Sequence, residues 1–264
     1  MLIQINNDCY IIIEDKIGTN VHNDQINVYA KRLNEEDKIP QENILCVFYK
    51  TIEQAFSEPK PIVNCTRQDI LSILNQYKGS NLIVLNYRQY LQDMEDMTEN
   101  WRRTAMNQWD SWSWRGFFRH ITESGLIDYR SEKRLDGWNY IQKGGYYGIW
   151  WKLWRDDDKI KLEKKGLIHS TLYLQLTSEK KVSIRVSCNI QNYSKNIRIL
   201  IEQWFKKYLK DNYNIDFCLP RKRSRSNTFE IGYISIDEKN YKERISLMEL
   251  AHSAFLQSPE KFSK

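Results

Sequence analysis

The apolar pattern at the start of the chain predicts a β-hairpin. Residues 2–5 and 10–13 are rich in β-branched side chains, and a short polar turn separates them. Residues 10–13 are apolar at every position, which is typical of a strand covered on both faces. Because side chains two apart on a strand share a face, Glu14 and Lys16 project together from the strand end and Asp15 points the other way.

A helical period follows and predicts a helix over about residues 21–33. Apolar residues at i, i+4 and i+7 form its expected buried stripe: Ile26, Ala30 and Leu33. Polar residues with similar spacing lie beside that stripe: Gln25, Tyr29 and Arg32. The helix therefore has a polar edge that stays on one side over two turns.

Further alternation of strand and helix patterns continues to about residue 97. The expected elements are a strand at 43–49, a helix at 67–77, a short strand at 82–85 and a helix at 87–97. Strands alternating with helices predict an α/β layer whose sheet is at least partly parallel. Residues 1–97 are therefore expected to form the first domain.

Residues 98–264 have a different pattern, which predicts an α+β C-terminal module. An aromatic helical stretch is expected over about 101–123, followed by a glycine-rich turn region at 137–147. Strands are expected at 148–154, 168–176, 182–190 and 229–236, and helices at 195–211 and 239–257. The strands at 168–176 and 182–190 alternate apolar and polar residues around a short turn, as a hairpin does.

Composition narrows the class of protein. Hydrophobic residues make up 41% and charged residues 28% of the 264 positions, as in an ordinary globular protein. No apolar run approaches the roughly 20 residues that span a bilayer, so we expect a cytoplasmic protein without a membrane partner. Five scattered cysteines without a CxxC spacing indicate neither a disulfide framework nor a zinc site. A net charge of +6 permits a polyanionic partner without requiring one, and a homo-oligomer is left open.

The end of the second predicted strand carries candidate chemistry for phosphodiester hydrolysis. Metal-assisted hydrolysis needs carboxylates that hold Mg²⁺ and a cation that orients water or stabilises the transition state. Glu14 and Lys16 supply one of each on the same face, and the backbone carbonyl of Asp15 is a further candidate metal ligand. The alternative is a solvated strand end with a minor surface ion pair, worth under ~1 kcal/mol.

This stretch resembles the active-site region of the PD-(D/E)XK nuclease superfamily, in which a strand ends in a carboxylate, any residue and then lysine. Here that motif is Glu14-Asp15-Lys16, and the helix that follows carries Gln25 and Tyr29, similar to the QxxxY signature of the RecB-like and lambda-exonuclease-like branches. The resemblance implies a restriction-endonuclease-like α/β core, a mixed sheet flanked by helices, over residues 1–97.

The resemblance also implies roles for these residues. Glu14, with Asp15 beside it, would hold Mg²⁺ or Mn²⁺, Lys16 would position the attacking water, and Gln25 and Tyr29 would orient the substrate and brace the site. The implied partner is nucleic acid, with DNA favoured over RNA.

The chain departs from the family at one position. The family places an acidic residue about a dozen positions before the motif glutamate, and in this chain that count reaches Met1 or just before it. Two expectations follow: either the chain is truncated at its N-terminus, or it is a remnant that has lost its metal site. Since one carboxylate binds Mg²⁺ poorly, we expect weak nuclease activity or none.

Two other segments are candidates for contact with nucleic acid, besides Arg32 on the polar helix edge. The densest basic run is Arg221-Lys222-Arg223-Ser224-Arg225, which fits phosphate contact and a solvated loop equally. Residues 101–119 interleave aromatic residues with arginines, which fits a platform for single strands or a buried core. His22, near the start of the first helix, fits a proton shuttle or a surface residue. The alternative functions are non-catalytic nucleic-acid binding and a protein-interaction subunit of a defence or restriction system.

Overall fold

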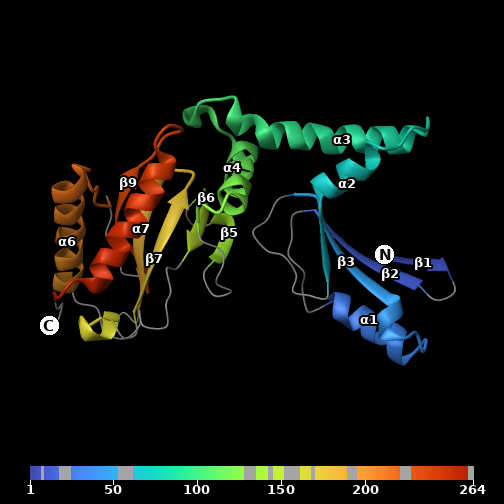
Figure 1. Ribbon diagram of the computed structural model, residues 1–264, viewed down its shortest axis with the longest axis horizontal. Helices are drawn as coiled ribbons and strands as arrows, with labels where there is room; N and C mark the ends of the chain where they lie inside the picture. The colour runs from blue at the N-terminus through green and yellow to red at the C-terminus, as the bar shows by residue number, and fades with distance from the viewer. Residues whose placement is uncertain are drawn as a thin grey trace. The chain divides into compact units, whose positions relative to one another are not determined.

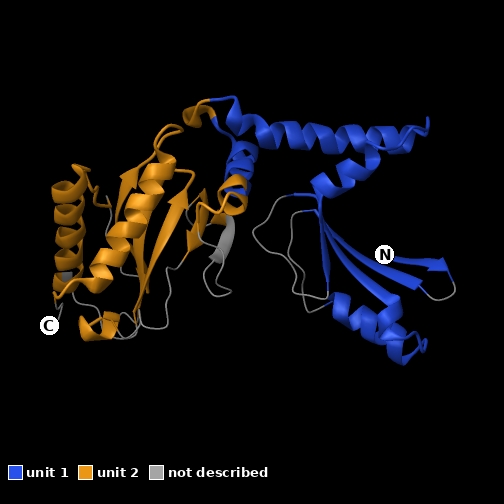
Figure 2. Ribbon diagram, viewed as in Figure 1, with its two compact units in different colours: residues 1–104, 109–119 blue, residues 105–108, 120–264 orange. Residues whose placement is uncertain are grey.

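The computed structural model describes residues 1–6, 9–17, 25–52, 62–127, 135–141, 145–151, 161–167, 170–188, 195–220 and 227–260. The chain divides into two compact units. Unit 1 comprises residues 1–104 and 109–119, and unit 2 comprises residues 105–108 and 120–264 (Figure 2).

Unit 1 contains a four-stranded mixed sheet. Its strands, in spatial order, are β1 (Leu2–Asn6), β2 (Cys9–Lys16), β3 (Ile44–Lys50) and β4 (Val63–Thr66). The β1–β2 pair is the expected antiparallel hairpin, whereas β2–β3 and β3–β4 are parallel. The prediction of a partly parallel α/β sheet is confirmed, and β4 is a strand that the sequence pattern did not indicate.

Helix α1 (Gln25–Glu35) packs on one face of this sheet (Figure 1). Ile26 and Ala30 of its apolar stripe are buried in one cluster with Ile12 of β2 and with Cys46 and Phe48 of β3. The 3.6-residue period therefore identified the buried side of α1 correctly. A short 3₁₀ helix, η1 (Gln41–Asn43), leads from α1 into β3.

Two further helices of unit 1 begin at side-chain caps. Helix α2 (Arg67–Leu74) begins with a capping box, in which the Thr66 hydroxyl accepts a hydrogen bond from the Asp69 amide and the Asp69 carboxylate accepts one from the Thr66 amide. Helix α3 (Leu82–Glu99) begins after Asn81, whose side-chain oxygen accepts a hydrogen bond from the Ile83 amide at 2.9 Å.

The predicted strand at 82–85 is wrong, because these residues form the first turn of α3. A short apolar run fits a strand and a buried helix equally well, and here the Asn81 cap favours the helix.

Most of the aromatic side chains in the segment at 101–119 form a buried core. Two 3₁₀ helices, η2 (Asn100–Arg102) and η3 (Met106–Gln108), precede helix α4 (Ser111–Glu123), so the helix is shorter than expected. Trp101 and Trp114 are 9% and 4% exposed, and Phe117 and Phe118 are fully buried. Trp109 lies edge-on to Trp114 with ring centroids 4.9 Å apart. Most of the rings pack on one another, which favours the buried core over a platform for bases.

Unit 2 contains a five-stranded antiparallel sheet whose strands follow chain order. They are β5 (Leu135–Ile141), β6 (Tyr146–Trp151), β7 (Thr171–Thr177), β8 (Lys181–Ser187) and β9 (Thr228–Ser235). The β7–β8 hairpin is confirmed. Residues 137–141, expected in a turn, belong to β5, because pairing with β6 outweighs their glycine content.

Helices α6 (Lys195–Tyr213) and α7 (Tyr241–Gln257) contact each other and cover one face of this sheet (Figure 1). Alternate residues of β7 and β8 point towards them and are almost fully buried: Leu172, Leu174, Leu176, Val182, Ile184 and Val186. The residues between these point to the other face. No helix in the described ranges is both long and apolar enough to cross a bilayer.

Candidate functional site

Three polar side chains meet at the carboxyl end of β2. The Lys16 Nζ atom lies 2.7 Å from Glu14 Oε1 and donates a hydrogen bond of 3.2 Å to Gln25 Oε1. The Lys16 and Glu14 side chains are 19% and 13% exposed, so the pair is largely withdrawn from water. We call Glu14, Lys16 and Gln25 the Lys16 site.

The packing of α1 brings Gln25 to the end of the strand. Ile12 shares a strand face with Glu14 and Lys16 and is buried against α1. Ile26 of α1 lies in the same cluster, so Gln25, the residue before it and the first of the helix, is held at the strand end. Apolar burial therefore fixes a polar contact that neither element forms alone.

The other predicted site residues in the described ranges form no hydrogen bond or ion pair with the Lys16 site. Tyr29 is 41% exposed and Arg32 is exposed, and neither forms a hydrogen bond or ion pair with another described residue. Four residues along a helix correspond to an axial rise of about 6 Å, which carries Tyr29 away from the level of Gln25. The Asp15 side chain is exposed, and alternation along β2 directs it to the opposite face from Lys16.

Several predicted residues lie outside the described ranges. They are His22 and the basic run of Arg221, Lys222, Arg223 and Arg225.

Lys50 is a functional candidate that the sequence reasoning missed. Lys50 is the last residue of β3 and pairs with Lys16 in the parallel register of β2 and β3. The residue is buried, with 8% of its surface exposed. Burial and, to a smaller extent, the nearby charges of Arg115 and Lys16 together lower the pKa of Lys50 to about 8, against the opposing effect of Asp15. The sequence could have indicated Lys50, because it directly follows the predicted strand at 43–49 and the carboxyl ends of parallel strands meet at one edge of a sheet.

Positive charge therefore collects at this sheet edge. Burial makes the protonated form of Lys50 costly, and the positive charges of Arg115 and Lys16 add to that cost. A phosphate group at this edge would relieve the repulsion between the cations, so the electrostatics favour an anionic ligand.

The donors at the Lys16 site do not complete a metal shell. Glu14 has the hard oxygen atoms that Mg²⁺ prefers, but Mg²⁺ takes near-octahedral oxygen coordination. In the part of the chain that the structure describes, no group of three or more His, Cys, Asp or Glu side chains could hold a metal ion. The described residues thus provide one carboxylate beside Lys16, and that carboxylate is already paired with a cation.

A buried ion network braces the neighbouring strand end. Arg67, 1% exposed, donates from Nε and Nη2 to Glu95 Oε2 at 3.0 and 2.7 Å, and from Nη1 to the Thr51 carbonyl at 3.0 Å. Thr51 directly follows Lys50. Arg119 donates to Glu95 Oε1 at 2.8 Å. Although burial raises the pKa of Glu95, the hydrogen bonds from Arg119 and Arg67 outweigh it and lower this pKa to about 2.

Comparison with known proteins gives one match, which covers the part of the chain that contains the Lys16 site. Residues 1–114 match the family model described as the PD-(D/E)XK nuclease superfamily. No curated protein and no solved structure matches the chain. Residues 1–114 are therefore similar to the PD-(D/E)XK nuclease superfamily, the family that the Glu14-Asp15-Lys16 motif resembles. The predicted fold class, an α/β core with a mixed sheet flanked by helices, is confirmed, and a second, antiparallel sheet follows it.

Proposed function

We propose that the protein binds nucleic acid at the Lys16 site, DNA in preference to RNA, and that its metal-dependent hydrolysis of phosphodiester bonds is weak or absent. The observation that carries the proposal is the fixed position of Lys16, whose Nζ is held by Glu14 at 2.7 Å and by Gln25 at 3.2 Å. A cation held in one place at a strand end is a ready partner for a phosphate oxygen.

Lys16, Gln25 and two neighbouring cations have defined tasks in this proposal. Lys16 donates to a phosphate oxygen, where its charge also stabilises the negative charge that develops during hydrolysis. Gln25 keeps the Lys16 ammonium group in position. Lys50 and Arg115 raise the local positive potential and attract the strand.

We expect weak hydrolysis because Glu14 is the one carboxylate of the Lys16 site. Mg²⁺ or Mn²⁺ at a single carboxylate would bind weakly, and Lys16 already neutralises Glu14. The described residues thus favour binding over cleavage. For the same reason a second candidate is a purely non-catalytic nucleic-acid-binding subunit of a defence or restriction system.

Fluorescence anisotropy with a labelled 20-base-pair DNA duplex, in EDTA and over a series of salt concentrations, tests the binding. Each phosphate contact contributes about 0.9 to the slope of log K against log salt. We expect Lys16→Ala to weaken binding and to reduce this slope by about 0.9, and an RNA duplex of the same sequence to bind less tightly.

The matched control is Lys31→Ala, which removes an exposed lysine of α1 whose side chain is 70% exposed. We expect it to change the affinity little. Binding that is insensitive to salt, or equal effects of Lys16→Ala and Lys31→Ala, would remove the Lys16 site from the proposal.

A further inference from the structure

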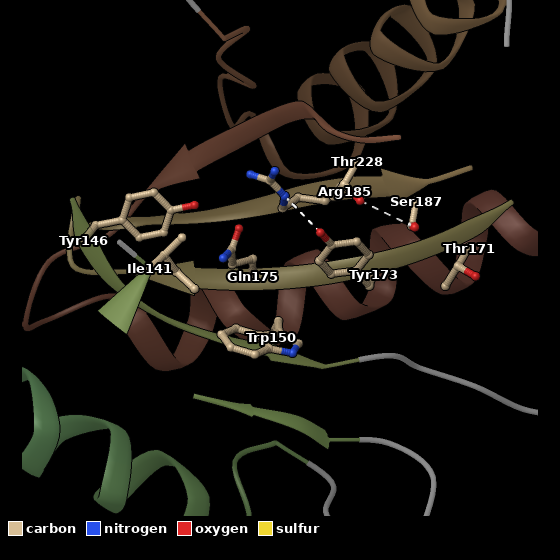
Figure 3. A pocket seen from close by; sticks show the side chains of 9 residues that line it. All are labelled: Ile141, Tyr146, Trp150, Thr171, Tyr173, Gln175, Arg185, Ser187 and Thr228. Atoms are coloured by element: carbon tan, nitrogen blue, oxygen red, sulfur yellow. Dashed lines mark hydrogen bonds between the residues drawn. The ribbon is translucent and has the colours of Figure 1, made fainter. Parts of the chain in front are cut away.

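The face of the unit 2 sheet that lies opposite α6 and α7 carries a pocket of about 370 Å³. Its lining combines three aromatic rings, an amide, a guanidinium group and several hydroxyl groups, which come from β5 to β9. Figure 3 shows Gln175 among Tyr146, Trp150 and Tyr173, with Arg185 beside Tyr173. No residue of this pocket belongs to unit 1.

Strand register sets this arrangement. Trp150 of β6 is the cross-strand partner of Gln175 on β7, and Tyr173 of β7 is the partner of Arg185 on β8. Directly paired residues on neighbouring antiparallel strands share a face and lie roughly 5 Å apart. The aromatic, amide and guanidinium groups are therefore neighbours on one rigid surface.

Gln175 is a buried polar residue in the lining of this pocket. It is 5% exposed, and its Oε1 atom is buried without a hydrogen-bond partner among the described residues. A Cβ atom on Gly148 would lie 3.0 Å from Gln175 Nε2, so the glycine leaves room for the amide. Because a buried acceptor without a partner is unfavourable, a ligand that donates to this amide would be bound selectively.

Arg185 is the cation of the pocket. Its Nε donates to the Tyr173 hydroxyl at 3.1 Å, and its Nη1 lies 3.8 Å from Glu230, beyond hydrogen-bond range. Glu230 pairs more closely with Lys181, at 3.1 Å. The Nη atoms of Arg185 donate no hydrogen bond to any residue that the structure describes, so they can bind an anion.

We propose that this pocket binds a nucleotide. The base stacks on the aromatic surface of Trp150 and its neighbouring tyrosines, its polar edge pairs with the Gln175 amide, and its phosphate contacts Arg185. The amide supplies both an acceptor and a donor, which matches the paired donor and acceptor groups on a base edge. A cavity of this volume lies within the usual range of small-ligand sites.

Single-stranded nucleic acid and free nucleotides present the same chemistry to the pocket. Neither source needs a metal or the Lys16 site, so the inference is independent of the function proposed above.

Two binding measurements on the full chain in EDTA distinguish the sources. The first follows the anisotropy of a labelled 12-nucleotide single-stranded DNA, and the second is calorimetry with adenosine monophosphate. If the pocket binds both the oligonucleotide and adenosine monophosphate, it is a mononucleotide site. If it binds the oligonucleotide alone, it is a site for single strands.

Variants assign the binding to the pocket. Loss of a stacking ring typically weakens single-strand binding about tenfold, so we expect about that loss for Trp150→Leu. Arg185→Gln should weaken binding and reduce its salt dependence. The control for Arg185→Gln is Lys206→Gln, which removes an exposed charge from α6. In a Lys16→Ala background, Trp150→Leu should weaken binding by the same factor as in the unaltered chain.

Photocrosslinking does not depend on any variant. An oligonucleotide with 5-iodouracil should crosslink to peptides that contain residues 146–151 or 171–187, as mapped by mass spectrometry. Crosslinks found only elsewhere, or affinities that Trp150→Leu and Arg185→Gln leave unchanged while circular dichroism shows both variants folded, would overturn the proposal.

Discussion

Replacing Glu95 by glutamine tests the electrostatics that hold the edge of the unit 1 sheet. Glu95 is 13% exposed and accepts hydrogen bonds from both Arg67 and Arg119. Its pKa falls from 4.5 to about 2 in the folded chain. At about 1.36 kcal/mol per pKa unit, this shift corresponds to about 3 kcal/mol of stability at pH 7. Glu95→Gln keeps the side-chain volume but leaves two arginines without their shared carboxylate.

The pH dependence has a definite sign. Because the folded-state pKa of Glu95 lies below the unfolded-state value, the contribution is complete above about pH 4.5 and disappears as the pH falls through about 2. We therefore expect Glu95→Gln to lower the free energy of unfolding by about 3 kcal/mol at pH 7 and by about half of that at pH 3.

Equilibrium urea unfolding at the two pH values measures this difference. Pulse labelling by hydrogen exchange, read on peptides from α3, identifies the transition that belongs to unit 1. The control is Asp96→Asn, an exposed neighbour on α3 that accepts a hydrogen bond from Gln92 and should change stability by less than about 0.5 kcal/mol. A loss below about 1 kcal/mol for Glu95→Gln at pH 7, or a loss that is the same at pH 7 and pH 3, would refute the reasoning.

Three further predictions concern stability. The pKa of Lys50 is lowered from 10.5 to about 8, so the stability of unit 1 should rise between about pH 8 and 10.5, and Lys50→Met should abolish this rise in urea titrations. A Cβ atom on Gly116 would collide with the backbone carbonyl of Thr98, so Gly116→Ala should cost about 1–3 kcal/mol, and an unchanged melting temperature would contradict this packing. Phe205 is fully buried in unit 2, so Phe205→Ala should cost about 3–5 kcal/mol, measured as a lower urea midpoint for the transition of unit 2 alone.

Local patterns predicted the parts of the fold that depend on short-range physics. The hairpin of β1 and β2 and the buried stripe of α1 follow from side-chain periods of two and 3.6 residues. These two periods are enough to place the Glu14-Lys16 pair at a strand end and Gln25 on the helix that follows. The apolar run at 82–85 was misread because its period does not separate a strand from a helix, and the Asn81 cap decided the outcome.

Long-range pairing explains what the sequence could not show. Lys50 reaches Lys16 only because β3 lies parallel to β2, and that register joins residues 34 positions apart. The pocket around Gln175 needs β5 to β9 to pair in order, including a glycine-containing strand that local propensity disfavours. The aromatic residues at 101–119 were ambiguous because a stacking platform and a core use the same residue types, and burial alone separates them.

The central claim is that the Lys16 site binds nucleic acid with little or no cleavage. The most direct test incubates labelled DNA with the protein in Mg²⁺ or Mn²⁺, and measures bound and cleaved DNA for the unaltered chain and for Lys16→Ala. We predict binding that Lys16→Ala weakens, together with cleavage no greater than that of the variant. Metal-dependent cleavage that Lys16→Ala abolishes would contradict the claim and show a working nuclease, and DNA binding that Lys16→Ala leaves unchanged would contradict the assigned site.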